Sequence, residues 1–335
     1  PTNKGAACEL GKGTDWCTAA PGLDYYEEYH TDEDPLIIFI PKHPEHKGQK
    51  YQIHFGTGQF MDEEDIDVSD PKKAELISLI KPAKKAFGQD IQKKISQYVY
   101  KKFDDGREYS QGPEGKEWLL NGKRHREDGP AVEHAGGHKE WYLNGKLHRE
   151  DGPAIEWANG HKEWYLNGKK HREDGPAVES VTRRKEWYLN GKRHREDGPA
   201  IEYVDGTKEW YLNGELHRED GPAVEFTDGT KHWFLNGKRH REDGPAVEGP
   251  GDRKEWLLNG KRHREDGPAI DWGDGDKEWW LNGERHREDG PAVEHANGKK
   301  HWFLNGEFHR EDGPAIEGPD GDKEWFLNGK NVDPF

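Results

Sequence analysis

The sequence predicts a mainly β protein, in which a small N-terminal α+β domain precedes an elongated antiparallel stack of β-hairpin repeats. Three observations support this fold class. A tryptophan returns every 23 residues from Trp118 to Trp325, an Asn-Gly pair follows each of these tryptophans at one fixed offset, and the first hundred residues lack this period. A fixed period is typical of solenoids, in which each repeat buries its apolar side only against its neighbours. We therefore expect two domains, 1–103 and 104–335.

Composition alone would indicate disorder, because hydrophobic residues make up 30% of the chain, charged residues 35%, and mean hydropathy is −1.26. The constant phase of ten repeats outweighs that reading. Lys and Arg number 51 against 67 Asp and Glu, a formal charge of −16. Such a protein repels nucleic acid, so we expect none to bind. The longest apolar run, 36–40, falls far short of the ~20 residues of a membrane span, and we expect no such span.

In the N-terminal domain, 36–40 reads as a buried strand and 51–55 as its half-buried neighbour, followed by a short third strand at 59–61. Asp before Pro predicts a helix that begins at Asp70. A second helix is expected over 89–102, where apolar residues recur at helical spacing.

The two cysteines, Cys8 and Cys17, have neither a disulfide-framework nor a metal-ligand spacing. Cys17 with a histidine base such as His54 would permit thiolate chemistry. A cysteine buried behind Trp16 is the simpler interpretation, because free cysteines are often buried. We therefore expect no enzymatic activity and no cofactor, and we keep a Cys17-centred activity as the alternative.

Each repeat has a regular plan. Lys-Glu-Trp-x-Leu reads as one strand with Trp and Leu on one face, and Asn-Gly predicts a tight hairpin turn. His-Arg-Glu-Asp-Gly-Pro-Ala then recurs unchanged nine times, from His125 to Ala315, and its Asp-Gly-Pro predicts a second reversal before a Val/Ile-Glu strand. Five variable residues close the repeat. Two strands per repeat predict a rise of about 10 Å and an array on the order of 90–100 Å long.

The recurring His-Arg-Glu-Asp segment, here called the rail, is the first candidate site. It could bind divalent metal or a polymer of matching repeat. We favour a structural loop, in which Asp caps its own turn and Arg bridges to the next repeat. One histidine per ~10 Å does not supply the converging ligands that zinc needs, so no metal is expected. The rail residues are His125, Arg126, Asp128, His148, His171, His194, His217, His240, His263, His286 and His309.

Aromatic residues outside the regular spacing are the second candidate site. The regular tryptophans are expected to pack in the core. The irregular ones lie near the variable edge or on the opposite face and are better candidates for contact with a protein partner. They are Trp157, Tyr203, Phe226, Trp272 and Trp280.

Over residues 116–330 the pattern Trp-x-x-Asn-Gly-Lys-x-His, a later Gly and an edge Asp-Gly resembles the MORN repeat. The resemblance implies an elongated hairpin stack used for protein interaction, dimerisation or scaffolding. In this chain Arg-Glu-Asp separates His from Gly, where the MORN pattern has Gly directly after His, and Pro-Ala follows. This departure argues against the lipid binding that is sometimes proposed for the family.

Residues 11–19 resemble a "GKGTxWCTA" segment of uncharacterised tailed-bacteriophage proteins, and 51–62 resemble the second half of the same module. The only methionine is Met61, so we expect the reading frame to begin upstream of Pro1. The resemblance implies a virion or a host cell as the setting and fixes no localisation. We expect a non-enzymatic scaffold, a phage structural or host-interaction protein, that binds a protein partner or itself. The alternative is an effector whose array delivers Cys17 chemistry.

Overall fold

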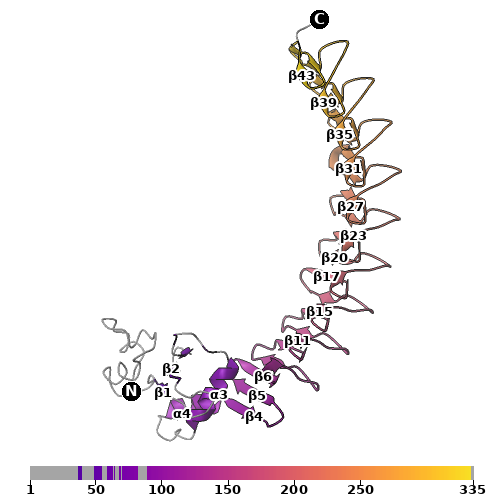
Figure 1. Cartoon of the computed structure of the whole chain (residues 1–335). Coiled ribbons are helices and arrows are strands. Elements are labelled where there is room, and N and C mark those ends of the chain that lie inside the picture. The colour runs from indigo at the N-terminus through magenta and orange to yellow at the C-terminus, as the bar shows by residue number, and fades with distance from the viewer. Residues whose placement is uncertain are drawn as a thin grey trace, which may run out of the picture. The chain divides into compact units, whose positions relative to one another are not determined.

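A computed structural model describes residues 37–39, 49–54, 59–62, 64, 68, 70–81 and 89–332 (Figure 1). The chain divides into two compact units, Pro1–Asn159 and Gly160–Phe335, and each is described by itself. The fold is mainly β, an antiparallel meander of hairpins with a small N-terminal region, as the sequence predicts. None of the helices in the described ranges has both the length and the apolar character needed to cross a membrane.

The first unit begins with a three-stranded sheet of β1 (Ile37–Phe39), β2 (Tyr51–His54) and β3 (Gln59–Met61). All four residues of β2 are buried, so the expectation of a half-buried strand is wrong. The reason is that helices α3 (Asp70–Ile80) and α4 (Gln89–Ser96) supply apolar side chains to the same core. This core comprises Ile37, Ile53, Phe60, Ile77, Ile80, Ile91 and Ile95.

The predicted second helix ends earlier than expected. It stops at Ser96, and Val99–Lys102 forms strand β4, which pairs with β5 (Arg107–Gly112). Val99 and Tyr100 favour extended backbone, and the long partner strand outweighs their helical spacing. The remaining strands of this unit are β6 (Gly115–Leu120), β7 (Lys123–Arg124), β8 (Val132–His134), β9 (Lys139–Glu140), β10 (Tyr142–Leu143), β11 (Lys146–Leu147) and β12 (Ile155–Glu156).

In the second unit each repeat contributes two strands to a meander sheet, and the pairing runs in chain order without closing into a barrel in the described residues. The repeats follow one another in a single row (Figure 1). The sheet strands are β13 (Lys162–Glu163), β16 (Val178–Glu179), β17 (Arg184–Glu186), β20 (Ile201–Tyr203), β21 (Lys208–Glu209), β24 (Val224–Glu225), β25 (Lys231–His232), β28 (Val247–Glu248), β29 (Lys254–Glu255), β32 (Ile270–Asp271), β33 (Lys277–Glu278), β36 (Val293–Glu294), β37 (Lys300–His301), β40 (Ile316–Glu317) and β41 (Lys323–Glu324).

Each repeat also forms a separate two-stranded hairpin around its Asn-Gly. Asn190 has φ +52° and Gly191 φ +84°, which is the left-handed backbone of a tight hairpin turn. These hairpins are β14 (Tyr165–Leu166) with β15 (Lys169–Lys170), β18 (Tyr188–Leu189) with β19 (Lys192–Arg193), β22 (Tyr211–Leu212) with β23 (Glu215–Leu216), β26 (Phe234–Leu235) with β27 (Lys238–Arg239), β30 (Leu257–Leu258) with β31 (Lys261–Arg262), β34 (Trp280–Leu281) with β35 (Glu284–Arg285), β38 (Phe303–Leu304) with β39 (Glu307–Phe308), and β42 (Phe326–Leu327) with β43 (Lys330–Asn331). A 3-10 turn, η4 (Pro250–Asp252), lies in one variable segment.

The expected single strand Lys-Glu-Trp-x-Leu is found in the first repeat, where β6 runs through Trp118. It is wrong for the later described repeats, because there the chain leaves the sheet at the tryptophan. In the repeat that begins at Trp187, the tryptophan N–H donates to the carbonyl of Ala200 (2.8 Å), and its carbonyl accepts from His194 N–H (3.1 Å). The tryptophan backbone therefore closes the rail loop. Residues before it pair in the sheet, and residues after it pair in the small hairpin.

The core of each repeat is smaller than the sequence suggests. Alanine of the Gly-Pro-Ala segment is 0% exposed in all nine copies, and the following Val or Ile is buried in most of them. The repeated tryptophans are half-buried and pack against this core from its margin, as Trp233 does against Ala246 and Val247. Small alanines let the loop backbone approach the sheet closely, and the tryptophan covers that contact from outside.

Candidate functional site

The side chain of the rail arginine is held within its own repeat. Arg195 Nε donates to Asp197 (2.9 Å), and its Nη1 donates to the carbonyl of Pro199 (3.2 Å) and to Glu202 (3.0 Å). The guanidinium lies over the Trp187 ring, 4.1 Å from its centroid. The expectation that this side chain bridges to the next repeat is therefore wrong. The same arginine-on-tryptophan contact occurs in all nine rail repeats, including Arg126 over Trp118 at 4.0 Å.

This arginine also explains the glycine of Asp-Gly-Pro. A Cβ on Gly198 would lie 3.0 Å from the Arg195 Cζ, so a larger residue would require the guanidinium to shift by a few tenths of an ångström. Asp197 is exposed, and its hydrogen bond and charge contact with Arg195 lower its pKa. The Asp is thus tied to its own loop through the arginine side chain.

The rail histidine makes the link between repeats. His194 Nδ1 accepts the backbone N–H of Asn213 in the next repeat (3.1 Å). Because Nδ1 is the acceptor, the neutral ring carries its proton on Nε2, which lies 3.7 Å from Glu196. The same bond to the following Asn N–H joins His125, His171, His217, His240, His263, His286 and His309 to their neighbours. His148 shares the low exposure of the others, 12% for its side chain.

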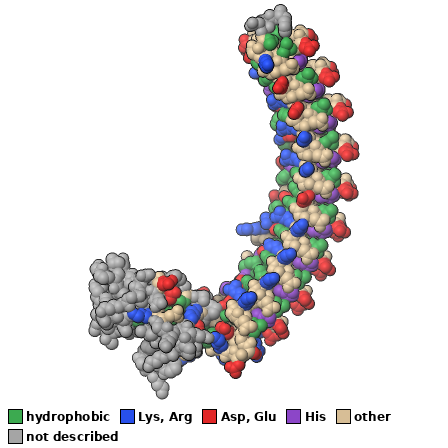
Figure 2. All heavy atoms as spheres, viewed as in Figure 1, with side chains coloured by type: hydrophobic (Ala, Val, Ile, Leu, Met, Phe, Trp, Pro, Cys, Tyr) green, Lys and Arg blue, Asp and Glu red, His purple; other side chains and the backbone are tan. Residues whose placement is uncertain are grey.

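What the rail leaves exposed is acidic. Its Glu and Asp side chains, such as Glu196 and Asp197, are 83% and 84% exposed, whereas His194 is only 15% exposed. Figure 2 shows acidic side chains in a row along one edge of the repeats, with histidines beside them. The rail is therefore a structural loop that carries a negatively charged edge.

The aromatic candidates share one place in the repeat. Trp157, Tyr203, Phe226 and Trp272 all follow the Val/Ile-Glu strand at the first variable position, here called the column position. In the sheet, the column residue pairs across neighbouring strands with the residue 19 positions before it in the sequence, as Tyr203 of β20 pairs with Arg184 of β17. Arg184 lies 5.9 Å from the Tyr203 ring centroid, and Arg253 lies 4.6 Å from that of Trp272. An arginine of the preceding repeat thus packs against the column ring of Tyr203 and of Trp272.

Exposure differs among these residues. Phe226 and Trp272 are 40% and 37% exposed, whereas Trp157 and Tyr203 are half-buried. Within the first unit, Trp157 packs on His138 with ring centroids 4.9 Å apart. The column position therefore presents partly exposed aromatic rings that contact neighbouring side chains.

Trp280 belongs to a different row, directly after the repeated tryptophan. Its indole N–H donates to Glu278 (2.9 Å), and its ring lies 5.0 Å and 5.2 Å from Arg262 and Arg285. It is half-buried. In each repeat, the residue after the repeated tryptophan and the Glu and Arg or Lys side chains around it form a row of contacts between the small hairpins, here called the ladder. Trp280 is one member, or rung, of this ladder, and this makes it a weaker contact candidate than the column residues.

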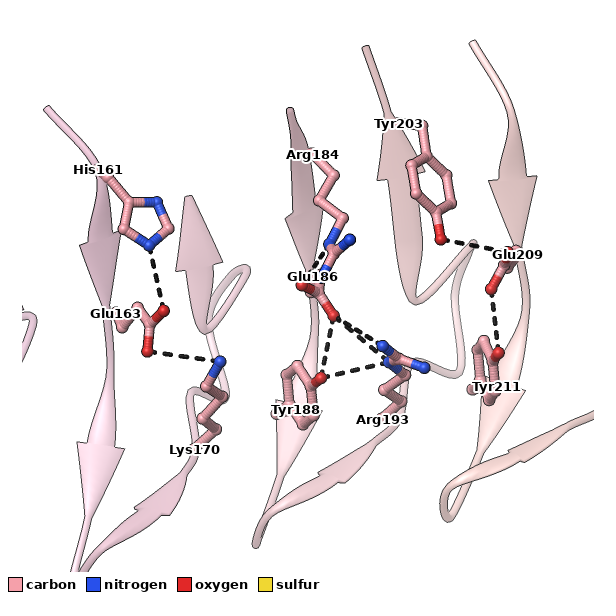
Figure 3. Close-up of polar contacts among 10 residues, drawn as sticks. All are labelled: His161, Glu163, Lys170, Arg184, Glu186, Tyr188, Arg193, Tyr203, Glu209 and Tyr211. Carbon is pink, nitrogen blue, oxygen red and sulfur yellow. Dashed lines mark hydrogen bonds and ion pairs between the residues drawn. The ribbon is translucent and has the colours of Figure 1, made fainter. Parts of the chain in front are cut away.

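Figure 3 shows this ladder in the central repeats. Glu186 accepts from Tyr188 (2.9 Å) and Arg193 (3.3 Å), and Arg193 in turn lies 5.3 Å from the Tyr211 ring. Burial of Glu186 favours its neutral form, but the hydrogen bonds from Arg184 and Tyr188 prevail and hold its pKa below the ordinary value. Burial, together with the Glu209 carboxylate, raises the pKa of Tyr211 to about 12. At neutral pH the Glu186 carboxylate is therefore ionised, whereas the Tyr211 hydroxyl is neutral.

One rung of the ladder is missing. Every repeat from Tyr142 onward has an aromatic residue after the tryptophan except at Leu257. A cleft of about 520 Å³ opens there, lined by Arg239, Glu255, Leu257, Arg262 and Trp280 with neighbouring hairpin residues.

The Cys17 alternative receives no test from the structure, because Cys17 lies outside the described residues. His54 ends β2, is buried, and pairs in register with Gln59. Elsewhere in the described chain, the side chains of His134, His138 and Glu140 converge, and none of these residues belongs to the rail pattern that the sequence singled out. Comparison with protein-family models and with curated proteins gives no match for this chain.

Proposed function

We propose that the array is a non-enzymatic scaffold that binds a protein partner through the column side of its sheet. One observation carries the proposal. The residues that recur in every repeat are used in contacts within the array, as Arg195 and His194 illustrate, whereas the column position varies from repeat to repeat. A constant frame with variable, rigid aromatic positions is typical of repeat proteins that recognise other proteins.

The charge distribution favours the same conclusion. The exposed acids of the rail give the array a negative edge, while arginines such as Arg184 and Arg253 lie on the column side beneath the aromatic rings. Long-range attraction would guide a partner with basic surface groups, and the aromatic residues would supply buried contact area. The setting proposed for such a scaffold, a bacteriophage particle or its host, rests on the resemblance of residues 11–19.

The test compares two triple variants of the full chain. In the first, the column residues of the second unit become serine (Tyr203→Ser, Phe226→Ser, Trp272→Ser). In the matched control, three exposed rail acids are neutralised (Glu196→Gln, Glu219→Gln, Glu265→Gln). Both are used for affinity purification and cross-linking from the cells that produce the protein, after circular dichroism has shown that the fold is kept.

We expect the column variant to lose a partner that the wild type and the rail variant retain. Loss in the rail variant alone would move the contact to the acidic edge. Equal capture by all three proteins would contradict binding through the array. A Cys17→Ala variant with full binding but no biological activity would instead favour the effector alternative.

A further inference from the structure

The hairpin that joins β8 to β9 brings two histidines and a glutamate together. His134 ends β8, and His138 immediately precedes β9, which ends at Glu140. The N–H of His134 donates to the His138 carbonyl (2.8 Å), so the two residues face each other across the turn, with ring centroids 5.0 Å apart. Glu140 lies on the same face as His138 because alternate residues of a strand share a face.

The ligand atoms of the three side chains lie close enough to one another to bind a single metal ion. His138 Nε2 lies 2.7 Å from Glu140 Oε1, His134 Nε2 lies 3.6 Å from the same oxygen, and all three ligand atoms lie within 4.8 Å of one another. Ligands at ~2.1 Å from a tetrahedral zinc ion are separated by roughly 3.4 Å, so small side-chain rotations suffice. His138 Nδ1 is buried, which leaves Nε2 as the atom that can coordinate.

We propose that His134, His138 and Glu140 form a binding site for a divalent transition-metal ion of the zinc class. Two imidazoles and one carboxylate are a donor set that zinc, copper and nickel prefer, whereas magnesium and calcium prefer oxygen ligands alone. Three protein ligands leave one position open for water or for a group from a partner. The inference goes beyond the scaffold proposal and does not depend on it.

Some neighbouring groups favour binding of the ion and others disfavour it. Tyr142 donates to Glu140 Oε2 (2.7 Å) and orients the carboxylate. Arg124 lies 3.6 Å from Oε2 and competes with a cation. His138 Nδ1 has no hydrogen-bond partner among the described residues, so we expect moderate affinity, since metal-bound histidines are normally supported there.

The chain contains its own control. One repeat later, His161 Nε2 lies 3.1 Å from Glu163 Oε1, the same pair as His138 and Glu140. At the column position of that repeat stands Trp157 instead of a histidine. Within the described residues no third histidine, cysteine or carboxylate converges on this pair, so His161→Ala should leave metal binding unchanged.

The experiment uses the full chain with Cys8→Ser and Cys17→Ser, so that thiols do not bind the probe. Zn²⁺ is titrated against a chromophoric chelator, and Co²⁺ absorption reports coordination by nitrogen and oxygen. The variants are His134→Ala, His138→Ala, His161→Ala and Arg124→Gln, each checked for fold by circular dichroism.

We expect one tightest site in the parent and in His161→Ala. That site should weaken at least about tenfold in His134→Ala and His138→Ala, because loss of even an outer-shell group costs 10- to 100-fold. Arg124→Gln should tighten it, and acidification should weaken it as protons compete for imidazole. Equal affinity and stoichiometry in the parent and His134→Ala would overturn the proposal, as would an equal loss in His161→Ala.

Discussion

At the scale of single residues, the repeats show how one arginine organises a whole loop. Arg195 reaches a ring, a carboxylate, a carbonyl and a strand glutamate at once. Lysine has no planar fork and could not make these contacts together. The one natural variation lies at Asp271, where the other repeats have Glu. Arg264 keeps its bonds to Asp266 and Pro268, but in the described structure it has no ion pair with the shorter Asp271.

Asp271→Glu should therefore stabilise its repeat by restoring the ion pair, and the reverse change Glu248→Asp should destabilise the preceding repeat, where Arg241 Nη1 lies 2.9 Å from Glu248. Both ends of the pair are partly exposed, so each effect should be ~0.2–1 kcal/mol. Denaturant midpoints of the two variants should move in opposite directions, and the difference should shrink in high salt. Shifts of the same sign would contradict this account of the loop.

At the scale of elements, local signals predicted the turns and missed the long-range contacts. Asn-Gly fixed each small hairpin correctly, because positive φ at both residues is a local property. The split of the strand at Trp187 depends on its bond to Ala200, thirteen residues away, and no local pattern encodes it.

The pairing of column residues with the preceding repeat could have been recognised in the sequence, because the paired residues match chemically. Arg184 with Tyr203, Arg253 with Trp272 and Asp276 with His295 are chemically matched pairs at one offset of 19 residues. Matching variable residues at every offset could have found these pairs. The proposed metal ligands His134 and His138 are the first and last of the five variable residues in one hairpin, so the recurring rail pattern does not include them.

The missing rung at Leu257 gives a prediction at this scale. Leu257→Tyr should place a ring between Arg239 and Arg262 and bring its hydroxyl towards Glu255, as Tyr211 does with Glu209 (3.0 Å). Cation–π contact and added burial should stabilise the two adjoining hairpins by about 1 kcal/mol. Hydrogen exchange at the N–H groups of Gly260 and Gly283, which donate across these hairpins, should slow.

The matched control for that change is Tyr211→Leu, which removes a rung that is present. It should speed exchange at Gly214 and Gly237, the corresponding donors. Faster hydrogen exchange at Gly260 and Gly283 in Leu257→Tyr would contradict the prediction, because it would mean that the cleft does not accept a ring between the two hairpins.

At the scale of the whole molecule, each repeat of the second unit contacts its neighbours through the same few bonds. His194 binds Asn213, and Arg195 N–H binds the Tyr211 carbonyl, one repeat on. Stability of such an array is a sum of repeat and interface terms. The sequence predicted this modularity directly, because the 23-residue step has no insertions from Trp118 to Trp325.

Excision of one full period, residues 208–230, should therefore leave a folded protein with a slightly lower denaturation midpoint. Its longest dimension in solution scattering should fall by about 10 Å, two strand spacings. Excision of 208–219 alone breaks the phase and should unfold the adjoining repeats, visible as loss of circular dichroism signal. Equal tolerance of both deletions would contradict a nearest-neighbour array.

The offset between column partners has a consequence for how such a chain can change. Arg184 and Tyr203 flank the constant segment, with the tryptophan, Asn-Gly and rail between them. Recombination between two repeats can have its crossover point inside the constant segment. It then separates Arg184 from Tyr203, or the equivalent pair, and gives each residue a new partner. Exchange within the variable turn, such as 204–207, keeps them together. The same 23-residue frame can thus be lengthened without new chemistry or recombined into new surfaces, depending only on where the crossover falls.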